Sequence, residues 1–114
     1  MIAVIFELEP HAGQSARYFE WAGALQASLM DVDGFISIER FESVGQSGRY
    51  LSLSFWRDEA AVSQWRNMAA HRAAQGEGRS RIFAHYRLRV AEVIRDYGLL
   101  DRAQAPDDSV HALG

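Results

Sequence analysis

The sequence contains no cysteine, which excludes disulfide bridges, a thiolate nucleophile and any zinc or iron–sulfur site held by cysteine. It contains no apolar stretch approaching about 18 residues, and its N-terminal segment lacks the basic start and apolar core of a secretion signal. With a net charge of −3, it also lacks the basic excess that attracts nucleic acid or anionic lipid. We therefore expect a cytoplasmic protein with neither a nucleic-acid nor a membrane partner.

The 114 residues fit a single domain, and their hydrophobic periodicity predicts strands and helices in a defined order. We expect a strand over residues 2–9, a helix over about 14–30, strands over 35–43 and 50–56, a helix or a pair of short helices over 58–75, and a strand over 82–95. This order is typical of the ferredoxin-like βαββαβ fold of the α+β class, in which two helices cover one face of an antiparallel four-stranded sheet. We expect residues 1–97 to form this domain and residues 98–114 to form a tail that is either mobile or docked on a partner subunit.

The alternation within each strand predicts which side chains face the helices. The expected set is apolar at every second position: Ile2, Val4, Phe6 and Leu8, then Ile36 and Ile38, then Leu51, Leu53 and Phe55, and finally Tyr86, Leu88 and Val90. Ser52, Ser54 and Phe35 then fall on the uncovered face. Glu7 and Glu9 can pair there with Arg87 and Arg89, because the first and last strands are neighbours in this fold. A mixed face and an unusually long last strand predict a homodimer in which two sheets stack into a barrel.

The segment over residues 58–75 carries the side chains best suited to chemistry. Trp65 lies in its apolar stripe, and His71 follows about 120° further around a continuous helix. His71 therefore shares a face with Trp65 only where the helix bends near Asn67. Arg72 lies close to the Trp65 direction and is a candidate for holding an anionic substrate. The histidines show no spacing typical of a metal site, so we predict no metal.

Four runs of sequence, WRDEAAVSQW, RNMAAHRAAQ, HYRLRVAEVIRDY and GFISIERFES, resemble those of the antibiotic biosynthesis monooxygenase family of dimeric α+β barrels. The resemblance implies a pocket between sheet and helices, where some members oxidise polycyclic phenols or anthrones with O₂ and without metal or flavin. Trp65 matches the helix tryptophan of such pockets. Relatives that degrade haem also carry an asparagine on the first strand and a histidine about ten residues after the tryptophan. This chain has Val4, Phe6 and Leu8 on that strand and Gln75 at the second position, which argues against haem degradation.

The resemblance implies a cytoplasmic homodimer that oxidises an aromatic or quinol-like small molecule with O₂ and without a bound cofactor. Trp65 and His71 are the expected catalytic residues. The expected substrate-binding residues are Phe6, Phe55, Arg72 and Tyr86. Structural alternatives remain open: Trp65 as core packing, His71 as an exposed or capping residue, and Tyr86 as a partner of the backbone. The alternative function is a non-catalytic small-molecule-binding or stress-associated dimer of the same fold.

Overall fold

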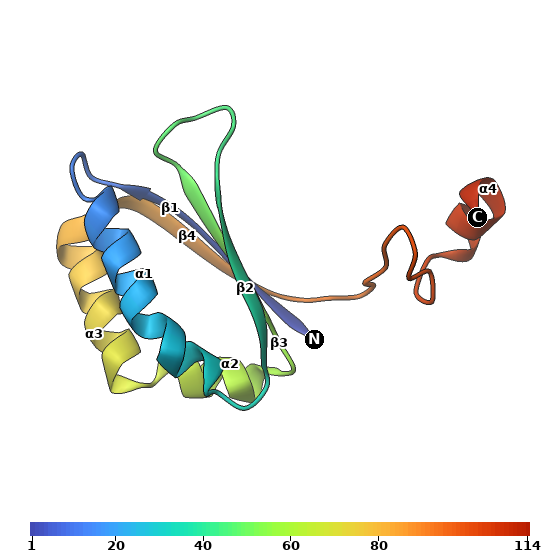
Figure 1. Ribbon diagram of the computed structural model, residues 1–114, viewed down its shortest axis with the longest axis horizontal. Helices are drawn as coiled ribbons and strands as arrows, with labels where there is room; N and C mark the ends of the chain where they lie inside the picture. The colour runs from blue at the N-terminus through green and yellow to red at the C-terminus, as the bar shows by residue number, and fades with distance from the viewer.

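The predicted order of elements is present in the computed structural model, which describes the backbone of residues 1–114 and every side chain except those of residues 69 and 70 (Figure 1). The elements are β1 (Ile2–Pro10), α1 (Ser15–Met30), β2 (Phe35–Glu42), β3 (Tyr50–Trp56), α2 (Glu59–Arg66), α3 (Ala69–Glu77), the π-helical turn η1 (Gly78–Ile82), β4 (Phe83–Glu92) and α4 (Asp107–Leu113). The strands form one antiparallel sheet in the order β2-β3-β1-β4. The predicted ferredoxin-like α+β fold is confirmed.

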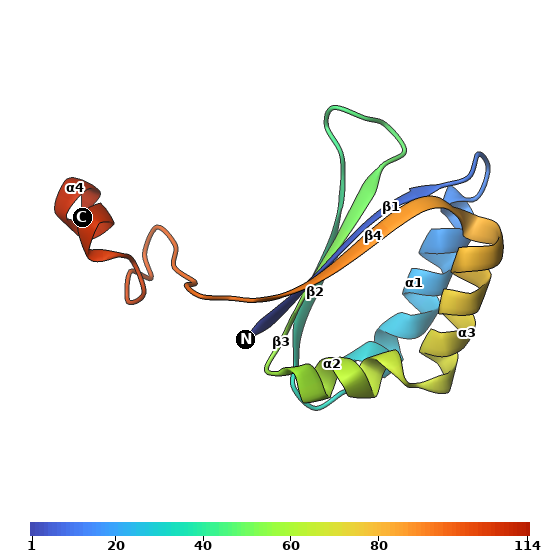
Figure 2. The same ribbon diagram turned by 180° about the vertical axis from the view of Figure 1, so that it is seen from behind.

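Helices α1, α2 and α3 all lie on one face of the sheet, as the two opposite views show (Figures 1 and 2). Strands β1 and β4 are neighbours, and Glu7 of β1 pairs with Arg89 of β4 at 3.3 Å, as predicted. Glu7 also meets Arg49 at 3.4 Å. Exposed pairs of this kind contribute only about 0.2–1 kcal/mol each. These ion pairs therefore add little to the stability of the sheet.

The segment predicted as one helix or two is a pair, because the chain breaks at residue 67. The Asp58 side chain accepts a hydrogen bond from the Ala61 backbone N–H at 2.9 Å and caps the start of α2. At the other end, the Asn67 side chain donates to the Ser63 carbonyl at 2.8 Å, and Met68 adopts an extended conformation before α3 begins. The bend on which the position of His71 depends is therefore present.

The second helical segment does not end at residue 75, as its predicted range implies. Helix α3 runs through Gly76 to Glu77, and the chain continues as η1 before β4 starts at Phe83. A Cβ at Gly78 would lie 2.6 Å from the Phe83 ring, so glycine is needed here for close approach and not as a helix stop.

Strand β4 ends at Glu92 rather than at Arg95, and is shorter than predicted.

The face assignment predicted for β3 was wrong. Its register pairs Ser52 with Phe6 and Ser54 with Val4, so both serines and Trp56 face the helices. Leu51, Leu53 and Phe55 lie on the open face instead. Period-two alternation separates the two sets of side chains but does not say which set lies under the helices.

Strand β2 departs from the prediction for a different reason. A register shift between Phe35 and Ser37 marks a β-bulge, which turns Phe35 toward the helices. The Phe35 ring packs edge-on against Trp56 with centroids 5.3 Å apart, so its predicted place on the open face was wrong. Ile36, predicted to face the helices, is 52% exposed.

The core consists of two separate clusters of buried side chains. One contains Leu29, Val32, Trp56, Ala61 and Val62, with Trp65 packed against it. The other is built from Leu8, Tyr18 and Ile82. The two clusters share no buried residue, and the candidate site described below is lined by residues from both.

Beyond β4 the chain leaves the sheet as an extended tail (Figure 1). It carries the short helix α4, which the sequence pattern did not predict, and four of its apolar side chains are fully or nearly fully exposed: Ile94, Leu99, Leu100 and Leu113. Among the residues that the structure describes, no helix combines the length and apolar character needed to cross a membrane.

Candidate functional site

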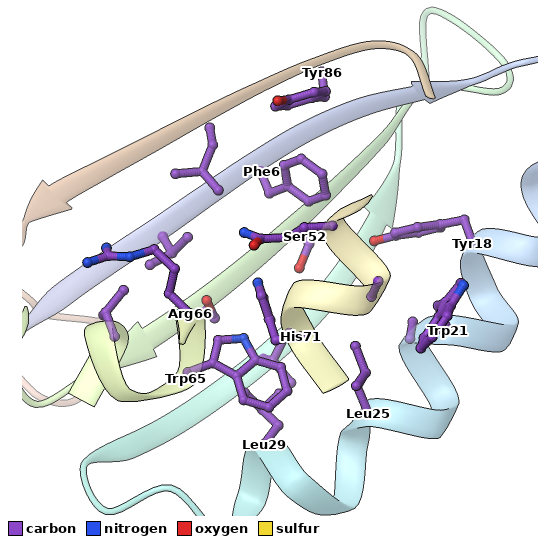
Figure 3. Close-up of a pocket in the computed structure, with 18 of the residues that line it drawn as sticks. Phe6, Tyr18, Trp21, Leu25, Leu29, Ser52, Trp65, Arg66, His71 and Tyr86 are labelled. Carbon is purple, nitrogen blue, oxygen red and sulfur yellow. The ribbon is translucent and has the colours of Figure 1, made fainter. Parts of the chain in front are cut away.

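A cavity of about 510 Å³ lies between the sheet and the helices (Figure 3). All four strands contribute to its floor, and α1, α2, α3 and η1 supply the remaining walls. Its apolar lining consists mainly of Val4, Phe6, Leu25, Leu29, Ile38, Trp56, Val62, Trp65, Ile82, Phe83, Tyr86, Leu88 and Val90. An apolar cavity of this size with a few polar groups is typical of a small-molecule site.

The cavity is open along β4. Tyr86, Leu88 and Val90 line it, yet they expose 48%, 49% and 42% of their surfaces. Arg40 lies at the opposite edge of the floor, on β2. Neighbouring strands are about 4.8 Å apart, so the floor extends roughly 14 Å from β2 to β4. The cavity can therefore hold an elongated molecule lying across the strands.

Trp65 and His71 meet inside the cavity. Their ring centroids are 4.7 Å apart, with the rings inclined by 74°. Trp65 comes from the last turn of α2 and His71 from the first turn of α3, so the break between these helices brings the two rings together. Figure 3 shows the imidazole extending from the helix layer toward the sheet. His71 is therefore a cavity residue and not an exposed or capping one.

The surroundings of His71 keep its imidazole uncharged. Burial lowers the pKa of His71 from 6.5 to about 4, and the positive charge of Arg72 acts in the same direction. Its Nδ1 is buried and has no hydrogen-bond partner among the described residues. A neutral imidazole with an unused nitrogen can accept or share a proton with a bound molecule.

Arginine is the only charged residue type in the lining. Arg66, Arg72 and Arg79 reach the cavity from the helix side, where they are exposed, and Arg40 reaches it from the sheet. The lining contains neither aspartate nor glutamate, although the whole chain has a net charge of −3. The cavity is therefore locally positive and favours anionic ligands.

Three hydroxyl groups add a polar patch to the floor and one wall. Ser52 and Ser54 of β3 are buried, and Ser54 accepts a hydrogen bond from the indole N–H of Trp56 at 2.9 Å. The Tyr18 hydroxyl points from α1 into the cavity toward Ser52 (Figure 3). Burial raises the pKa of Tyr18 in spite of the nearby Arg40, so the phenol stays protonated and can donate a hydrogen bond.

The structure brings five of the six residues selected from the sequence to the cavity: Phe6, Trp65, His71, Arg72 and Tyr86. Phe55 is the exception. It pairs with Ala3 in the register of β1 and β3 and lies on the open face, so its expected contact with a ligand in this cavity was wrong. Trp65 both packs against the core and lines the cavity, so core packing and a place in the candidate site do not exclude each other.

Sequence reasoning missed Tyr18, Arg40, Ser52 and Ser54. The alternation of β3 contained a signal, since polar residues at every second position of a central strand must face either solvent or a cavity. For Arg40 the signal was the alternation of β2, because Arg40 is the next position after Ile38 in the set predicted to face the helices. No pattern in α1 distinguished Tyr18 from its aromatic neighbours.

A polar cluster at the edge of the cavity ties α3 to α1. Glu77 accepts hydrogen bonds from Arg17 at 2.8 and 3.0 Å and from the indole N–H of Trp21. The Arg17 guanidinium lowers the pKa of Glu77, so this carboxylate stays charged. The cluster holds the helix that carries His71 against the helix that carries Tyr18.

The described side chains include no group of three or more histidine, aspartate or glutamate residues arranged to hold a metal ion. The first-strand position and the position ten residues after Trp65, which carry polar residues in the haem-degrading relatives, carry other residues here. Val4 and Phe6 face the cavity from β1, and Gln75 faces it from α3. The residues present therefore do not fit a haem site of that type.

Comparison with known proteins identifies the family. The family model for antibiotic biosynthesis monooxygenases matches residues 1–77. The chain is 44% identical over 93 residues to the jasmonate monooxygenase ABM of Pyricularia oryzae, which covers 82% of this chain and 43% of that protein. It is 33% identical over 78 residues to YqjZ, an uncharacterized protein of Bacillus subtilis, which covers 68% of this chain and 67% of that one. The chain belongs to the antibiotic biosynthesis monooxygenase family.

Two features of these matches limit what they show about this chain. The chain spans less than half the length of the jasmonate monooxygenase. Among solved structures, Rv0793 from Mycobacterium tuberculosis matches with a TM-score of 0.75 at 15% identity, covering 85% of this chain and 98% of that one. At this identity the match shows the shared fold alone.

Proposed function

We propose that the protein is a monooxygenase that oxidises a small aromatic or quinol-like molecule with O₂ and without a bound cofactor. The observation that carries the proposal is the contact between His71 and Trp65 inside a largely apolar cavity of about 510 Å³. The imidazole is placed to take a proton from the substrate, and the indole offers a flat surface for an aromatic ring. Membership in a monooxygenase family supports the same reading.

His71 acts in this proposal as the acceptor of a substrate proton. Its pKa of about 4 leaves it neutral and ready at physiological pH. Loss of a proton from a phenol or an activated CH₂ group places a negative charge beside the ring, and that charge raises the pKa of the imidazolium being formed. Arg72 lies next to His71 and stabilises the same substrate anion. Proton transfer is thus favoured only when a substrate is bound.

The oxidation step uses electrons from the substrate. A carbanion formed at a CH₂ group between two conjugated rings reduces O₂ and binds one of its oxygen atoms. The other oxygen leaves as water, so that R₂CH₂ and O₂ give R₂C=O and H₂O. The apolar walls formed by Phe6 and Trp65 exclude water from the anion and position it for reaction. Tyr86 lies on the open side, where its hydroxyl is available to a substrate oxygen.

The name of one relative widens the range of candidate substrates. The Pyricularia oryzae protein, 44% identical to this chain, is called a jasmonate monooxygenase, and jasmonate is a carboxylate. This chain spans only 43% of that protein, so the shared region need not carry the whole activity. Jasmonate therefore belongs in the substrate panel beside phenols and anthrones.

Oxygen uptake tests the proposal directly. With an electrode and a panel of anthrones, naphthols, hydroquinones and jasmonate, the wild-type protein should consume O₂ with at least one compound and release an oxygenated product. His71→Gln should lower the rate about 100-fold or more, as expected for the loss of a proton acceptor. His85→Gln is the matched control, because His85 is exposed on β4 and does not line the cavity. Equal rates in the two variants would contradict the role of His71.

The alternative is a ligand-binding dimer without catalysis, and the same panel separates the two. A binding protein would gain thermal stability with a panel compound and consume no O₂. Trp65→Ala distinguishes the cavity from other binding surfaces, because it removes the ring that contacts His71. Ligand stabilisation that survives Trp65→Ala would place binding outside this cavity.

The homodimer is part of the proposal. The open face of the sheet presents Ile5, Leu51, Leu53, Phe55 and Phe41, and no described part of the chain covers it. A second copy offers the same apolar face in a two-fold arrangement, which is the commonest form of oligomer. Family members assemble in this way according to the resemblance stated above, and this face is suited to the contact.

A further inference from the structure

Arg40 stands apart from the other arginines of the cavity by its position. It projects from β2, at the edge of the sheet opposite the open side, and it is partly buried. The remaining arginines of the lining come from helices and are exposed. The Nε of Arg40 is buried and has no hydrogen-bond partner among the described side chains. The structure thus leaves the Nε–H of this partly buried guanidinium without an acceptor among the described residues.

No counter-charge meets Arg40 within the described part of the chain. Arg17, Arg49, Arg57 and Arg89 each form at least one ion pair with a carboxylate, whereas Arg40 forms none. Glu42 shares its strand face but accepts a hydrogen bond from the Gly48 N–H. A partly buried, unpaired guanidinium is unfavourable unless a ligand supplies the missing charge.

Two hydroxyl groups lie beside Arg40. Ser52 is directly opposite it across β2 and β3, and both Arg40 and Ser52 are close enough to the Tyr18 hydroxyl to lower its pKa against the effect of burial. The three side chains come from separate elements, β2, β3 and α1, and converge at one end of the cavity. Together they offer two planar N–H groups and two O–H groups, the donor set of a carboxylate site.

The register of the sheet continues this site into an apolar strip. Arg40, Ser52, Phe6 and Leu88 occupy one row across β2, β3, β1 and β4. The row is about 14 Å long and runs from the guanidinium to the open side. Trp65 packs over Trp56, which lies about 13 Å from Ser52 along β3. A ligand bound at Arg40 can therefore extend its apolar body toward the Trp65 and His71 end.

We infer that Arg40, with Tyr18 and Ser52, binds a carboxylate of the substrate and thereby orients its reacting part toward His71. The inference rests on the proposed function in taking this cavity as the substrate site, but it requires no oxygen chemistry. A carboxylate is favoured over a phenolate because its two oxygens match the guanidinium fork and because it is ionised throughout the neutral pH range.

Matched acids and esters test the carboxylate site at Arg40, and the measurements are made under nitrogen, where no oxidation interferes. One pair is 6-hydroxy-2-naphthoic acid and its methyl ester, and the other is jasmonate and methyl jasmonate. Dissociation constants come from quenching of tryptophan fluorescence and from thermal shifts. The wild-type protein should bind each acid at least about tenfold more tightly than its ester. Arg40→Gln should weaken the acids about 10- to 100-fold and change ester binding less than about twofold.

Two further variants separate a specific pairing from general positive charge. Arg40→Lys keeps the charge but loses the fork, so it should recover only part of the affinity for the acids. Arg95→Gln, an exposed tail position, is the control and should leave both ligands unaffected. Inorganic phosphate at the same concentration should not displace the acids. Effective displacement by phosphate would replace the carboxylate assignment with a general anion site.

The remaining outcomes divide clearly. Equal affinity for acid and ester, or equal weakening of both by Arg40→Gln, would overturn the carboxylate inference and leave the oxygen-uptake result standing. Absence of binding by either ligand at millimolar concentration would contradict the inference and the cavity assignment together. Preference for the acids without any oxygen uptake would support the carboxylate site and contradict the monooxygenase proposal.

Discussion

The covered and open faces of the sheet carry opposite kinds of side chain along β3. Under the helices, β3 presents Ser52 and Ser54, and on the open face it presents Leu51, Leu53 and Phe55. In an isolated domain with one core, the apolar set would lie under the helices. The polar residues are under the helices here because the helices stand off from the sheet and leave a cavity. In the proposed homodimer, the apolar residues of the open face contact the partner subunit.

This comparison assigns a different task to each face. The covered face is built to hold a ligand, so it keeps hydroxyl groups and Arg40 at the cost of a less apolar core. On the open face, Ile5 and Phe41 extend the apolar surface of β3, and the proposed homodimer covers this surface. Contiguous apolar surface of this kind is typical of interaction sites. Substitutions on adjacent residues of β3 should therefore have unlike effects.

Leu53→Asp should have the largest effect, because it places a carboxylate at the centre of the open face. In the proposed dimer the two-fold axis brings two such charges near each other, and each uncompensated buried charge costs roughly 3–5 kcal/mol. Light scattering should give twice the chain mass of 12.8 kDa for the wild-type protein and the single mass for the variant. Far-UV circular dichroism should show that the variant stays folded.

Val44→Asp is the control for this experiment, because it also replaces an apolar side chain by aspartate. Val44 is fully exposed in the β2–β3 turn. It should remain dimeric. A wild-type protein that is monomeric at micromolar concentration, or a Leu53→Asp variant that stays dimeric, would show that the apolar open face has another explanation.

Ser54→Ala probes the covered face and should cost about 1–3 kcal/mol of unfolding free energy. It removes the acceptor of the buried Trp56 N–H, whose bond to Ser54 is 2.9 Å long, and leaves that donor unsatisfied. Urea denaturation monitors the loss. Ser37→Ala, at an exposed position of β2, should change stability by less than about 0.5 kcal/mol. Equal stability of the two variants would mean that water replaces the lost acceptor.

The order of strands and helices was predictable because each element has its own hydrophobic period. Trp65 and His71 were also predicted to lie at the candidate site, because few residue types suit proton transfer or aromatic packing, and both line the cavity. The bend near Asn67 was recognised as a condition for their meeting, but its presence depends on the Asn67 side chain returning to the Ser63 carbonyl. A hydrogen bond of this kind leaves no periodic trace in the sequence.

The faces of β2 and β3 were not predictable for a physical reason. Alternation fixes which side chains lie together but is symmetric with respect to the two faces. The usual rule places the apolar set inward, and it fails for β3 because the inward face of this strand lines a cavity. The bulge at Phe35 adds a second reversal within β2. Arg40 continues the alternation of Ile38 but was not recognised as a cavity residue, and Ser52, its partner across β2 and β3, was assigned to the wrong side.

The smallest expected effect comes from His71 on the covered face, whose titration makes the free energy of unfolding depend on pH. Its folded pKa of about 4 lies below the ordinary 6.5, so between these values the unfolded chain binds a proton that the folded chain does not. Wild-type stability should therefore fall as pH drops from 6.5 toward 4, relative to His71→Gln, and stay level below about 4. Between pH 7 and pH 5 the difference should reach about 1–2 kcal/mol, less than the full shift implies because solvent at the open side of the cavity screens the charge.

Urea denaturation of both proteins across this range tests the expectation, and the titration of carboxylates cancels in the difference between them. Repeating the measurement with a bound acid shows where its carboxylate lies. A carboxylate beside His71 raises the imidazole pKa and should narrow the pH range over which wild-type stability falls. An anion held only at Arg40, on the far edge of the floor, should leave this pH range wide. A flat difference between wild-type and His71→Gln would place the imidazole in water. The covered face would then lack the proton acceptor that distinguishes it from the open one.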